Sequence, residues 1–264
     1  MTRLTVRKTY KLYIGGAFPR SESGRTLVVE GANVARASRK DLRDAVRIAR
    51  QAGAGWSAQT AYNRGQILYR LAEMMEDRHA ALAAACKGKD EVDRAIDRVV
   101  WYAGWSDKLA QVVGSANAVA GPYFNFTVPE PTGVVGIIAP EPALLGLISR
   151  LLPALVGGNT AVVIASDEHP IAAIELAECI ATADVPAGVV NILTGQRSEL
   201  APWLAGHMDV SALDLSGADG AAAELEKIGA ENVKRIVRGS ADRQSLYEIT
   251  GLLELKTVWH PIGM

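Results

Sequence analysis

The 264-residue sequence has few cysteines and no excess of charge of either sign. Its two cysteines, Cys86 and Cys179, cannot form a disulfide framework, so we expect a reducing, cytoplasmic environment. Lysine and arginine number 28 against 29 aspartates and glutamates, a balance untypical of proteins that bind nucleic acid or anionic membrane surfaces. The composition therefore predicts neither a nucleic-acid partner nor a membrane partner.

Long hydrophobic runs are also absent. Residues 1–10 alternate between basic and apolar side chains and lack the hydrophobic core of a signal peptide. The most apolar stretch, Gly133–Ser166, is interrupted by Glu141, Arg150 and three prolines, whereas a membrane-spanning helix needs about 20 consecutive apolar residues. We interpret this stretch as two buried strands around a buried helix.

The motifs of several enzyme classes are missing as well. The sequence contains no Gly-x-Ser-x-Gly nucleophile elbow and no phosphate-binding loop of the Gly-x4-Gly-Lys-Ser/Thr type. No two of its four histidines have the spacing of metal ligands, so we predict no metal site. We expect structural or surface roles for these histidines, which are His79, His169, His207 and His260.

Residues 1–112 are predicted to form a short strand and several helices. Lys11–Ala17 is typical of a strand that ends in a Gly-Gly turn. Apolar side chains at helical spacing predict a helix that begins at a capping residue, Asp41, and continues to about Trp56. The same spacing predicts a second helix from about Tyr62 and another through Val92–Ala103.

Two further segments are predicted to form strands outside the main sheet. In residues 113–131, Tyr123–Val128 alternates aromatic and polar side chains and indicates one strand of a protruding hairpin. In residues 244–264, Leu253–Trp259 also alternates strongly, but it has no neighbouring strand in the sequence. Because an unpaired strand edge must be covered, we expect this strand to pair with the hairpin or with another chain.

Residues 132–240 alternate between short apolar runs and helical patterns, which predicts an α/β fold with a five-stranded parallel sheet covered on both faces. A ligand crevice is expected at the carboxyl ends of such strands. The predicted strands are Val134–Ala139, Ala161–Ala165, Val189–Leu193, Ala212–Leu215 and Val233–Val237, and the predicted helices are Ala143–Leu155, Ile171–Ala183, Ser198–Gly206 and Gly220–Gly229.

Three long motifs in this region resemble the Rossmann-like coenzyme domain of aldehyde dehydrogenases. Glu130–Pro140 is similar to its first strand, Leu152–Thr160 to the following helix and turn, and Pro186–Gly195 to its third strand. The resemblance extends over nearly all of Lys11–Arg238, and Leu253–Trp259 is similar to the last strand of the family's oligomerisation domain. The pattern is most similar to the degenerate second domain of two-domain aldehyde dehydrogenases.

The resemblance implies a chain without the family's catalytic domain. That domain has about 200 residues and lies between the coenzyme domain and the last strand, where this sequence has only Gly239–Arg243. The family's nucleophilic cysteine belongs to the missing part. Its oxyanion asparagine has no counterpart in Pro140–Ala143, and the position of its general-base glutamate falls near Gly239. We therefore predict no catalytic residues.

The resemblance also implies a weakened site for NAD. In the family, a lysine and a glutamate bind the adenosine ribose, and here Ile164 and the shorter Asp167 replace them. Loss of a charged hydrogen bond costs about 1.5–3 kcal/mol. The predicted vestigial cofactor-binding residues are Ile138, Asp167, Gly195 and Gly217. Each glycine can equally be an ordinary strand-end turn.

These observations favour a non-catalytic subunit that assembles with a full-length, NAD-dependent aldehyde dehydrogenase, which would carry out the oxidation. In the family, the hairpin and last strand join subunits, so both a heteromer and a homo-oligomer remain open. Two alternatives also remain open. One is a weak NAD(P)-binding regulatory module, and the other is an aldehyde dehydrogenase with residual oxidoreductase activity.

Overall fold

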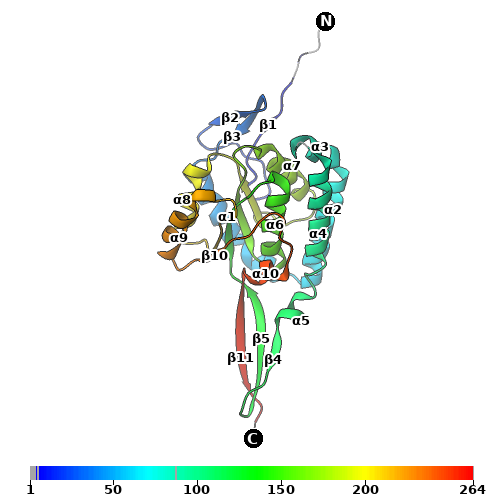
Figure 1. The fold of residues 1–264 in the computed structure, drawn as a ribbon, viewed down its shortest axis with the longest axis vertical. Coiled ribbons are helices and arrows are strands. Elements are labelled where there is room, and N and C mark those ends of the chain that lie inside the picture. Colours follow the sequence, from blue (N-terminus) through cyan, green and yellow to red (C-terminus); the bar gives the residue numbers. More distant parts are fainter. Residues whose placement is uncertain (1–3, 5, 87, 264) are drawn as a thin grey trace.

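A five-stranded parallel sheet lies at the centre of the molecule (Figure 1). The computed structural model describes residue 4, residues 6–86 and residues 88–263. The strand order is β10-β9-β6-β7-β8, which confirms the predicted α/β, Rossmann-like class. The strands are β6 (Val134–Ile138), β7 (Thr160–Ile164), β8 (Val190–Leu193), β9 (Ala212–Asp214) and β10 (Arg235–Val237).

Helices cover both faces of this sheet, which explains why β6 and β7 are buried at every position. On one face lie α1 (Arg39–Ser57), α8 (Arg197–Gly206) and α9 (Ala222–Ala230), preceded by the 3-10 turn η1 (Asp219–Ala221). On the other face lie α6 (Ala143–Val156) and α7 (Pro170–Ile180). An outer layer packs against these two and consists of α2 (Ala61–Asp77), α3 (His79–Cys86) and α4 (Lys89–Ala103).

The apolar stretch that includes α6 is a core element. All of its residues from Ala143 to Val156 are buried between the sheet and α4. None of the described helices combines the length and the apolar character that crossing a membrane requires.

The start of the chain differs from the sequence prediction. Lys11–Ala17 is not a continuous strand, because it forms only isolated bridges, from Tyr13 to Ile192 and from Ile14 to Ala17. A small sheet of order β1-β3-β2 was not predicted, and its strands are β1 (Thr9–Tyr10), β2 (Thr26–Val29) and β3 (Ala32–Ala35).

The cap of α1 also differs from the prediction. Ser38, not Asp41, is the N-cap residue, and Asp41 lies one turn inside the helix. The two side chains form a capping box, in which the Ser38 hydroxyl accepts from the Asp41 amide and the Asp41 carboxylate accepts from the Ser38 amide. At the other end of the helix, the Trp56 indole donates to the carbonyl of Leu155 at 3.1 Å, which ties α1 to α6.

A second, three-stranded sheet protrudes from the body (Figure 1). Its order is β11-β5-β4, and β11 (Leu253–Pro261) runs antiparallel to β5 (Tyr123–Pro131) along its full length. This confirms that the last predicted strand pairs with the hairpin. The shorter β4 (Ser115–Asn117) flanks β5, while α5 (Leu109–Val113) and α10 (Leu246–Thr250) connect the sheet to the body.

The short link between β10 and α10 is anchored in the body. Arg98 of α4 donates to the Ala241 carbonyl at 2.9 Å and to the Gln244 side chain at 2.8 Å. Arg150 of α6 is buried and binds Asp214 of β9 at 2.6 Å as well as Glu248 of α10. The end of the parallel sheet and the start of the protruding strand are therefore held by the same buried cations.

Candidate functional site

A pocket of 540 Å³ lies at the carboxyl ends of the parallel strands, between α8 and α9. The chain passes from β6 to β7 and β8 on one side of the sheet and then returns to β9 on the other side of β6. Ligands of open α/β folds bind at this switch in strand order. Of the predicted cofactor residues, Ile138, Asp167 and Gly217 line the pocket, whereas Gly195 is not among its lining residues.

Both glycines singled out in the sequence have packing roles. At Gly217, a Cβ atom would clash with the carbonyl oxygen of Ala139. Gly195 has a φ of +152°, and a Cβ there would lie 3.2 Å from the backbone nitrogen of Ala37. Close backbone packing therefore accounts for the glycine at each position.

Asp167 is already engaged by the protein. Its carboxylate accepts from the backbone N–H of Arg197 at 3.0 and 3.3 Å, so it caps the first turn of α8. Partial burial raises the pKa of Asp167, and the hydrogen bond from the Arg197 backbone opposes this rise. Ile164, which stands where the family has a lysine, is fully buried in β7.

Arg197 is the main feature of the crevice that sequence analysis missed. Its guanidinium donates to the carbonyl of Ala139 after β6 at 2.6 Å and to that of Gly217 after β9 at 3.1 Å. A longer contact, 3.4 Å, joins its Nε to the carbonyl of Ala165 after β7. The side chain is only 18% exposed. The one available signal was an arginine between the end of a predicted strand, Leu193, and the start of the next predicted helix, Ser198.

Carboxylates surround this guanidinium. Oxygens of Glu141, Asp167 and Asp219 lie 3.8, 3.9 and 4.0 Å from its nitrogens. Glu168 and Glu224 also line the pocket, and Arg197 is the one cation among the described residues that line it. Five carboxylates against one guanidinium give the crevice a negative potential, which disfavours polyanionic ligands.

The N-terminus of α6, the helix that follows β6, is occupied as well. The Glu91 carboxylate of α4 accepts from the backbone N–H groups of Leu144 at 2.8 Å and Leu145 at 3.0 Å. Free N–H groups at such a terminus are a common binding site for phosphate. The Glu91 carboxylate uses these two N–H groups here, so they are not free to bind a phosphate.

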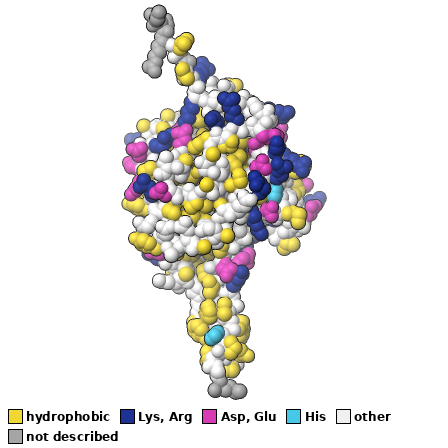
Figure 2. Space-filling model, turned by 180° about the vertical axis from the view of Figure 1, so that it is seen from behind, with side chains coloured by type: hydrophobic (Ala, Val, Ile, Leu, Met, Phe, Trp, Pro, Cys, Tyr) yellow, Lys and Arg dark blue, Asp and Glu magenta, His cyan; other side chains and the backbone are white. Residues whose placement is uncertain are grey.

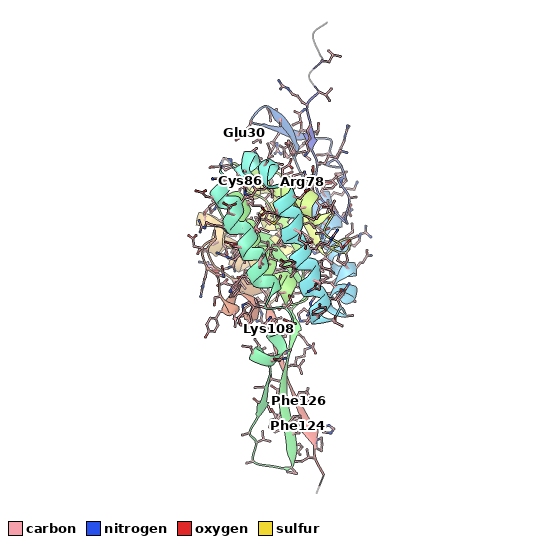
Figure 3. The ribbon with its side chains drawn as sticks, turned by 90° about the vertical axis from the view of Figure 1, so that its right-hand side faces the viewer. Glu30, Arg78, Cys86, Lys108, Phe124 and Phe126 are labelled. Carbon is pink, nitrogen blue, oxygen red and sulfur yellow. The ribbon has the colours of Figure 1, made fainter. Side chains whose placement is uncertain are left out.

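Neither cysteine has the setting of a nucleophile. Burial raises the pKa of Cys86 to about 12, with a smaller contribution from Glu91, and burial also raises that of Cys179 to about 12. The Cys179 thiol donates to the Glu175 carbonyl within α7. Cys86 lies in α3, at the end of the body opposite the protruding sheet (Figure 3). Since the thiolate is the attacking species, both groups are unreactive at neutral pH.

The position expected for a general base is filled by other groups. A Cβ atom at Gly239 would clash with the Arg150 guanidinium and would lie 3.0 Å from the Glu248 carboxylate. The guanidinium has no proton-accepting atom, and the Glu248 carboxylate is buried and paired with Arg150 and Arg243. Glu231, the nearest glutamate before β10, is the exposed C-cap of α9.

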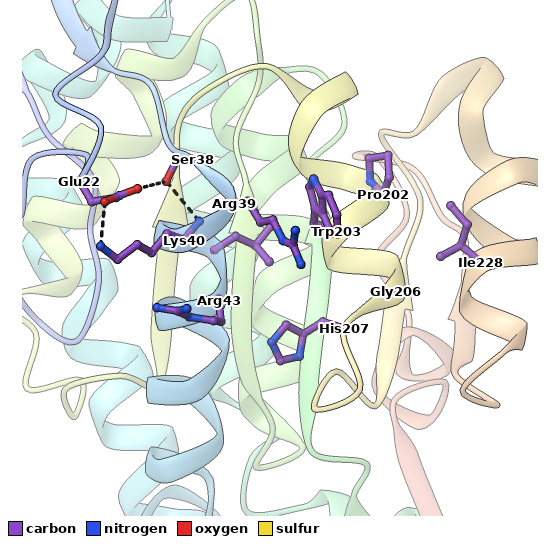
Figure 4. Close-up of a pocket in the computed structure, with 11 residues that line it drawn as sticks. Glu22, Ser38, Arg39, Lys40, Arg43, Pro202, Trp203, Gly206, His207 and Ile228 are labelled. Carbon is purple, nitrogen blue, oxygen red and sulfur yellow. Dashed lines mark hydrogen bonds and ion pairs between the residues drawn. The ribbon is translucent and has the colours of Figure 1, made fainter.

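A second pocket, of 780 Å³, lies on the other side of α8, near the start of α1 (Figure 4). The Arg39 guanidinium stacks over the Trp203 ring at 3.6 Å, and Lys40 binds Glu22 at 2.8 Å. Burial lowers the pKa of His207, which also lines this pocket. None of the predicted site residues lies here. Within the described parts of the chain, no group of His, Cys, Asp and Glu side chains has an arrangement that could hold a metal ion.

Comparison with known proteins places these observations in a family. Residues 28–239 match the aldehyde dehydrogenase family. The chain is 32% identical to aldehyde dehydrogenase, cytosolic 1 of Elephantulus edwardii over 89% of its own length and 51% of that protein. It is 33% identical to retinal dehydrogenase 2 of Gallus gallus, over 87% of this chain and 48% of that protein.

Solved structures agree. The fold superposes on a putative aldehyde dehydrogenase from Burkholderia cenocepacia with a TM-score of 0.82 at 29% identity, covering 86% of this chain and 51% of that one. An NAD+ complex of the Bacillus cereus aldehyde dehydrogenase gives 0.81 at 25% identity, with coverage of 88% and 50%. The chain spans about half the length of the relatives it matches. It belongs to the aldehyde dehydrogenase family.

Proposed function

We propose that this chain is a non-catalytic subunit that assembles with a full-length aldehyde dehydrogenase and leaves the oxidation to that partner. The observation that carries the proposal is the protruding sheet, which exposes large apolar side chains on both of its faces. These are Tyr123, Phe124, Val128, Leu255, Val258 and Trp259, each between 37% and 59% exposed.

The register of the sheet places these apolar side chains on both of its faces. Directly paired residues of antiparallel strands point to the same face, and Val258 pairs with Phe126 while Trp259 pairs with Asn125. One face therefore carries Phe124, Phe126 and Val258, and the other carries Trp259. Figure 2 shows hydrophobic side chains along the sheet, whereas most charged side chains lie on the body.

The outer edge of β11 adds a second reason for assembly. In the part of the chain that the structure describes, β11 pairs only with β5, so its other edge has free backbone donors and acceptors. Exposed apolar faces and open strand edges are surfaces through which proteins associate. Another polypeptide could pair with the open edge of β11 and could cover an apolar face of the sheet.

The crevice supports the non-catalytic part of the proposal. Burial raises the pKa of both thiols to about 12, and the Arg197 guanidinium lies across the strand ends within the crevice. We therefore propose that NAD binds weakly or not at all. This arrangement disfavours both an NAD(P)-binding regulatory module and a residual dehydrogenase. The unpaired cysteines are compatible with the cytoplasmic location that we also propose.

The test is co-expression with a full-length aldehyde dehydrogenase from the same organism, followed by size-exclusion chromatography with light scattering. We expect one peak that contains both chains. Phe124→Asp should split it, because a charge on the apolar face would have to be buried at the interface. Tyr69→Asp is the matched control, since Tyr69 is likewise 50% exposed but lies on α2 of the body.

Two separate peaks for the unmodified chains would contradict the heteromer. A homo-oligomer of the chain alone that ignores the catalytic enzyme would also contradict it. Steady NAD reduction with an aldehyde by the isolated, homogeneous chain would contradict the non-catalytic assignment.

A further inference from the structure

We propose that the Arg197 side chain closes the crevice to dinucleotides, so that weak cofactor binding results from side chains in the crevice and not from loss of the fold. The inference rests on the weak NAD binding proposed above and names Arg197 as a cause. The parallel sheet, its strand order and the pocket are all in place. The Arg197 guanidinium lies across the strand ends, where it donates to the carbonyls of Ala139 and Gly217.

The guanidinium lies at the switch in strand order. It bridges the carbonyl of Ala139, directly after β6, and that of Gly217, which follows the neighbouring β9. A pyrophosphate that enters the crevice approaches the backbone between these same two strand ends. Arg197 and a dinucleotide therefore compete for one space.

The contacts of Arg197 make it costly to displace. Its donors form charge-assisted hydrogen bonds, which are stronger than neutral ones. If the side chain rotated away, the carbonyls of Ala139 and Gly217 would lose these partners in a largely buried region. The backbone of Arg197 is fixed by its N–H bond to Asp167, so only side-chain rotation could open the crevice.

The surrounding charge prevents Arg197 from acting as a phosphate ligand in place. Its positive charge is already shared among Glu141, Asp167 and Asp219 at 3.8 to 4.0 Å. A phosphate beside the guanidinium would also lie beside these carboxylates, and like charges at such distances repel. Arg197 thus fills the site without making it attractive to an anion.

Removal of the side chain should uncover a usable pocket. Its apolar wall includes Ile138, Ala201, Ala218 and Leu225, which suits a flat, apolar ring such as adenine. Arg197 is the first residue of α8, where glycine is less disruptive than in the middle of a helix. Arg197→Gly is therefore a direct test.

The experiment is calorimetric titration of NAD into the full chain, with adenosine as an uncharged probe of the pocket. We expect Arg197→Gly to bind adenosine at least about tenfold more tightly than the unmodified chain, and NAD more tightly by a smaller factor, because the carboxylates that line the crevice remain and repel its phosphates. Arg197→Met, which keeps length but removes the charged donors, should give a smaller gain in the same direction. Arg20→Gly is the control, because Arg20 is an exposed arginine in a loop outside the crevice.

The possible outcomes distinguish the role of Arg197 from the weak NAD binding on which that role rests. Tight NAD binding by the unmodified chain would overturn both. If Arg197→Gly and Arg197→Met are folded by circular dichroism and bind NAD no better than the unmodified chain, only the role of Arg197 is rejected. Weaker binding by both variants would show that Arg197 is a phosphate ligand, which would also reject it.

Discussion

The body and the protruding sheet differ in how far they bury their apolar side chains. In the body, β6 and β7 are covered on both faces and every residue of α6 is buried. In the protruding sheet, Phe124 and Trp259 are 50% and 59% exposed. The body buries most of its apolar side chains itself, and the exposed sheet is the surface on which the proposed assembly depends.

The same contrast holds for polar groups. In the crevice of the body, donors and acceptors are satisfied internally, by Arg197 on the strand ends and by Glu91 at the start of α6. At the outer edge of β11, the described chain supplies no partner strand. A surface whose polar groups are already paired offers few hydrogen-bond partners to a ligand, whereas an open strand edge can pair with another strand. This difference between the crevice and the β11 edge is what the two proposals above rest on.

The largest effect is expected where the two regions are joined. Arg150→Met should lower the free energy of unfolding by about 3–5 kcal/mol, because it leaves the buried Asp214 without its cation and removes one of the two cations that bind Glu248, which keeps Arg243. Urea denaturation measures this loss. The control is Arg238→Met, since Arg238 is 53% exposed and its pair with Glu226 is worth under about 1 kcal/mol. Equal losses would show that the buried network does not hold the regions together.

A matched pair of tryptophans compares the two regions directly. Trp56→Ala should cost about 3–5 kcal/mol of unfolding free energy, because Trp56 is 1% exposed and donates to Leu155. Trp259→Ala should cost under about 1 kcal/mol in the isolated chain, since it loses mainly an edge-on contact with Tyr123. Denaturation at low protein concentration separates the two. A large loss at Trp259 would mean that the sheet is stabilised without a partner.

The rate at which the two cysteines react with an alkylating reagent tests whether the body contains a nucleophilic thiol. With pKa values of about 12, Cys86 and Cys179 should react with iodoacetamide at pH 8 at least about a hundredfold more slowly than a free cysteine. Urea should restore the ordinary rate by unfolding the chain. Rapid alkylation of either cysteine in the native protein would contradict this and would reopen a catalytic role.

The smallest effect concerns acid stability. Burial alone would raise the pKa of Glu175, but hydrogen bonds from Lys8 and Arg78 outweigh it and lower the pKa. The carboxylate thus stabilises the fold above its unfolded pKa of about 4.5, and this contribution is lost as the pH falls through the lower folded value.

Replacement of this carboxylate provides the measurement. Glu175→Gln should lower the free energy of unfolding by about 1 kcal/mol at pH 7. The loss is small because Lys8, one of the partners of Glu175, is itself 45% exposed. The variant should also lose less stability than the unmodified chain as the pH falls. Urea midpoints between pH 3 and pH 7 record both effects. Glu73→Gln, at an exposed pair with Arg70, is the control and should change neither. Unchanged acid dependence in Glu175→Gln would assign the acid transition to other carboxylates.

Much of the fold was readable from the sequence because its signals are local. Continuous apolar runs predicted β6 and β7, because both faces of these strands are buried. Alternating aromatic, β-branched and polar residues predicted β5 and β11, although few residues of these two strands are buried. The small β1-β3-β2 sheet was missed because Thr26–Val29 and Ala32–Ala35 are short and mostly unburied. The cap of α1 was misplaced because Ser38 and Asp41 are both good capping residues.

The candidate site was readable only in part. Ile138, Asp167 and Gly217 were identified through the resemblance and do line one pocket. Arg197 was missed because an arginine at the start of a helix ordinarily extends into solvent. Its acceptors are backbone carbonyls 20, 32 and 58 residues away, and a carbonyl has no sequence signature.

The sequence by itself determined the order of strands and helices, the need of the last strand for a pairing partner, and the absence of a separate domain between Gly239 and Arg243. The tertiary structure alone decided that this partner is β5, that the Arg197 guanidinium lies across the strand ends, and that Glu91, 53 residues away, caps α6. Periodicity is fixed by neighbours along the chain. Which side chains fill a site depends on residues that come together only after the sheet has formed, so it could not be predicted from the sequence pattern.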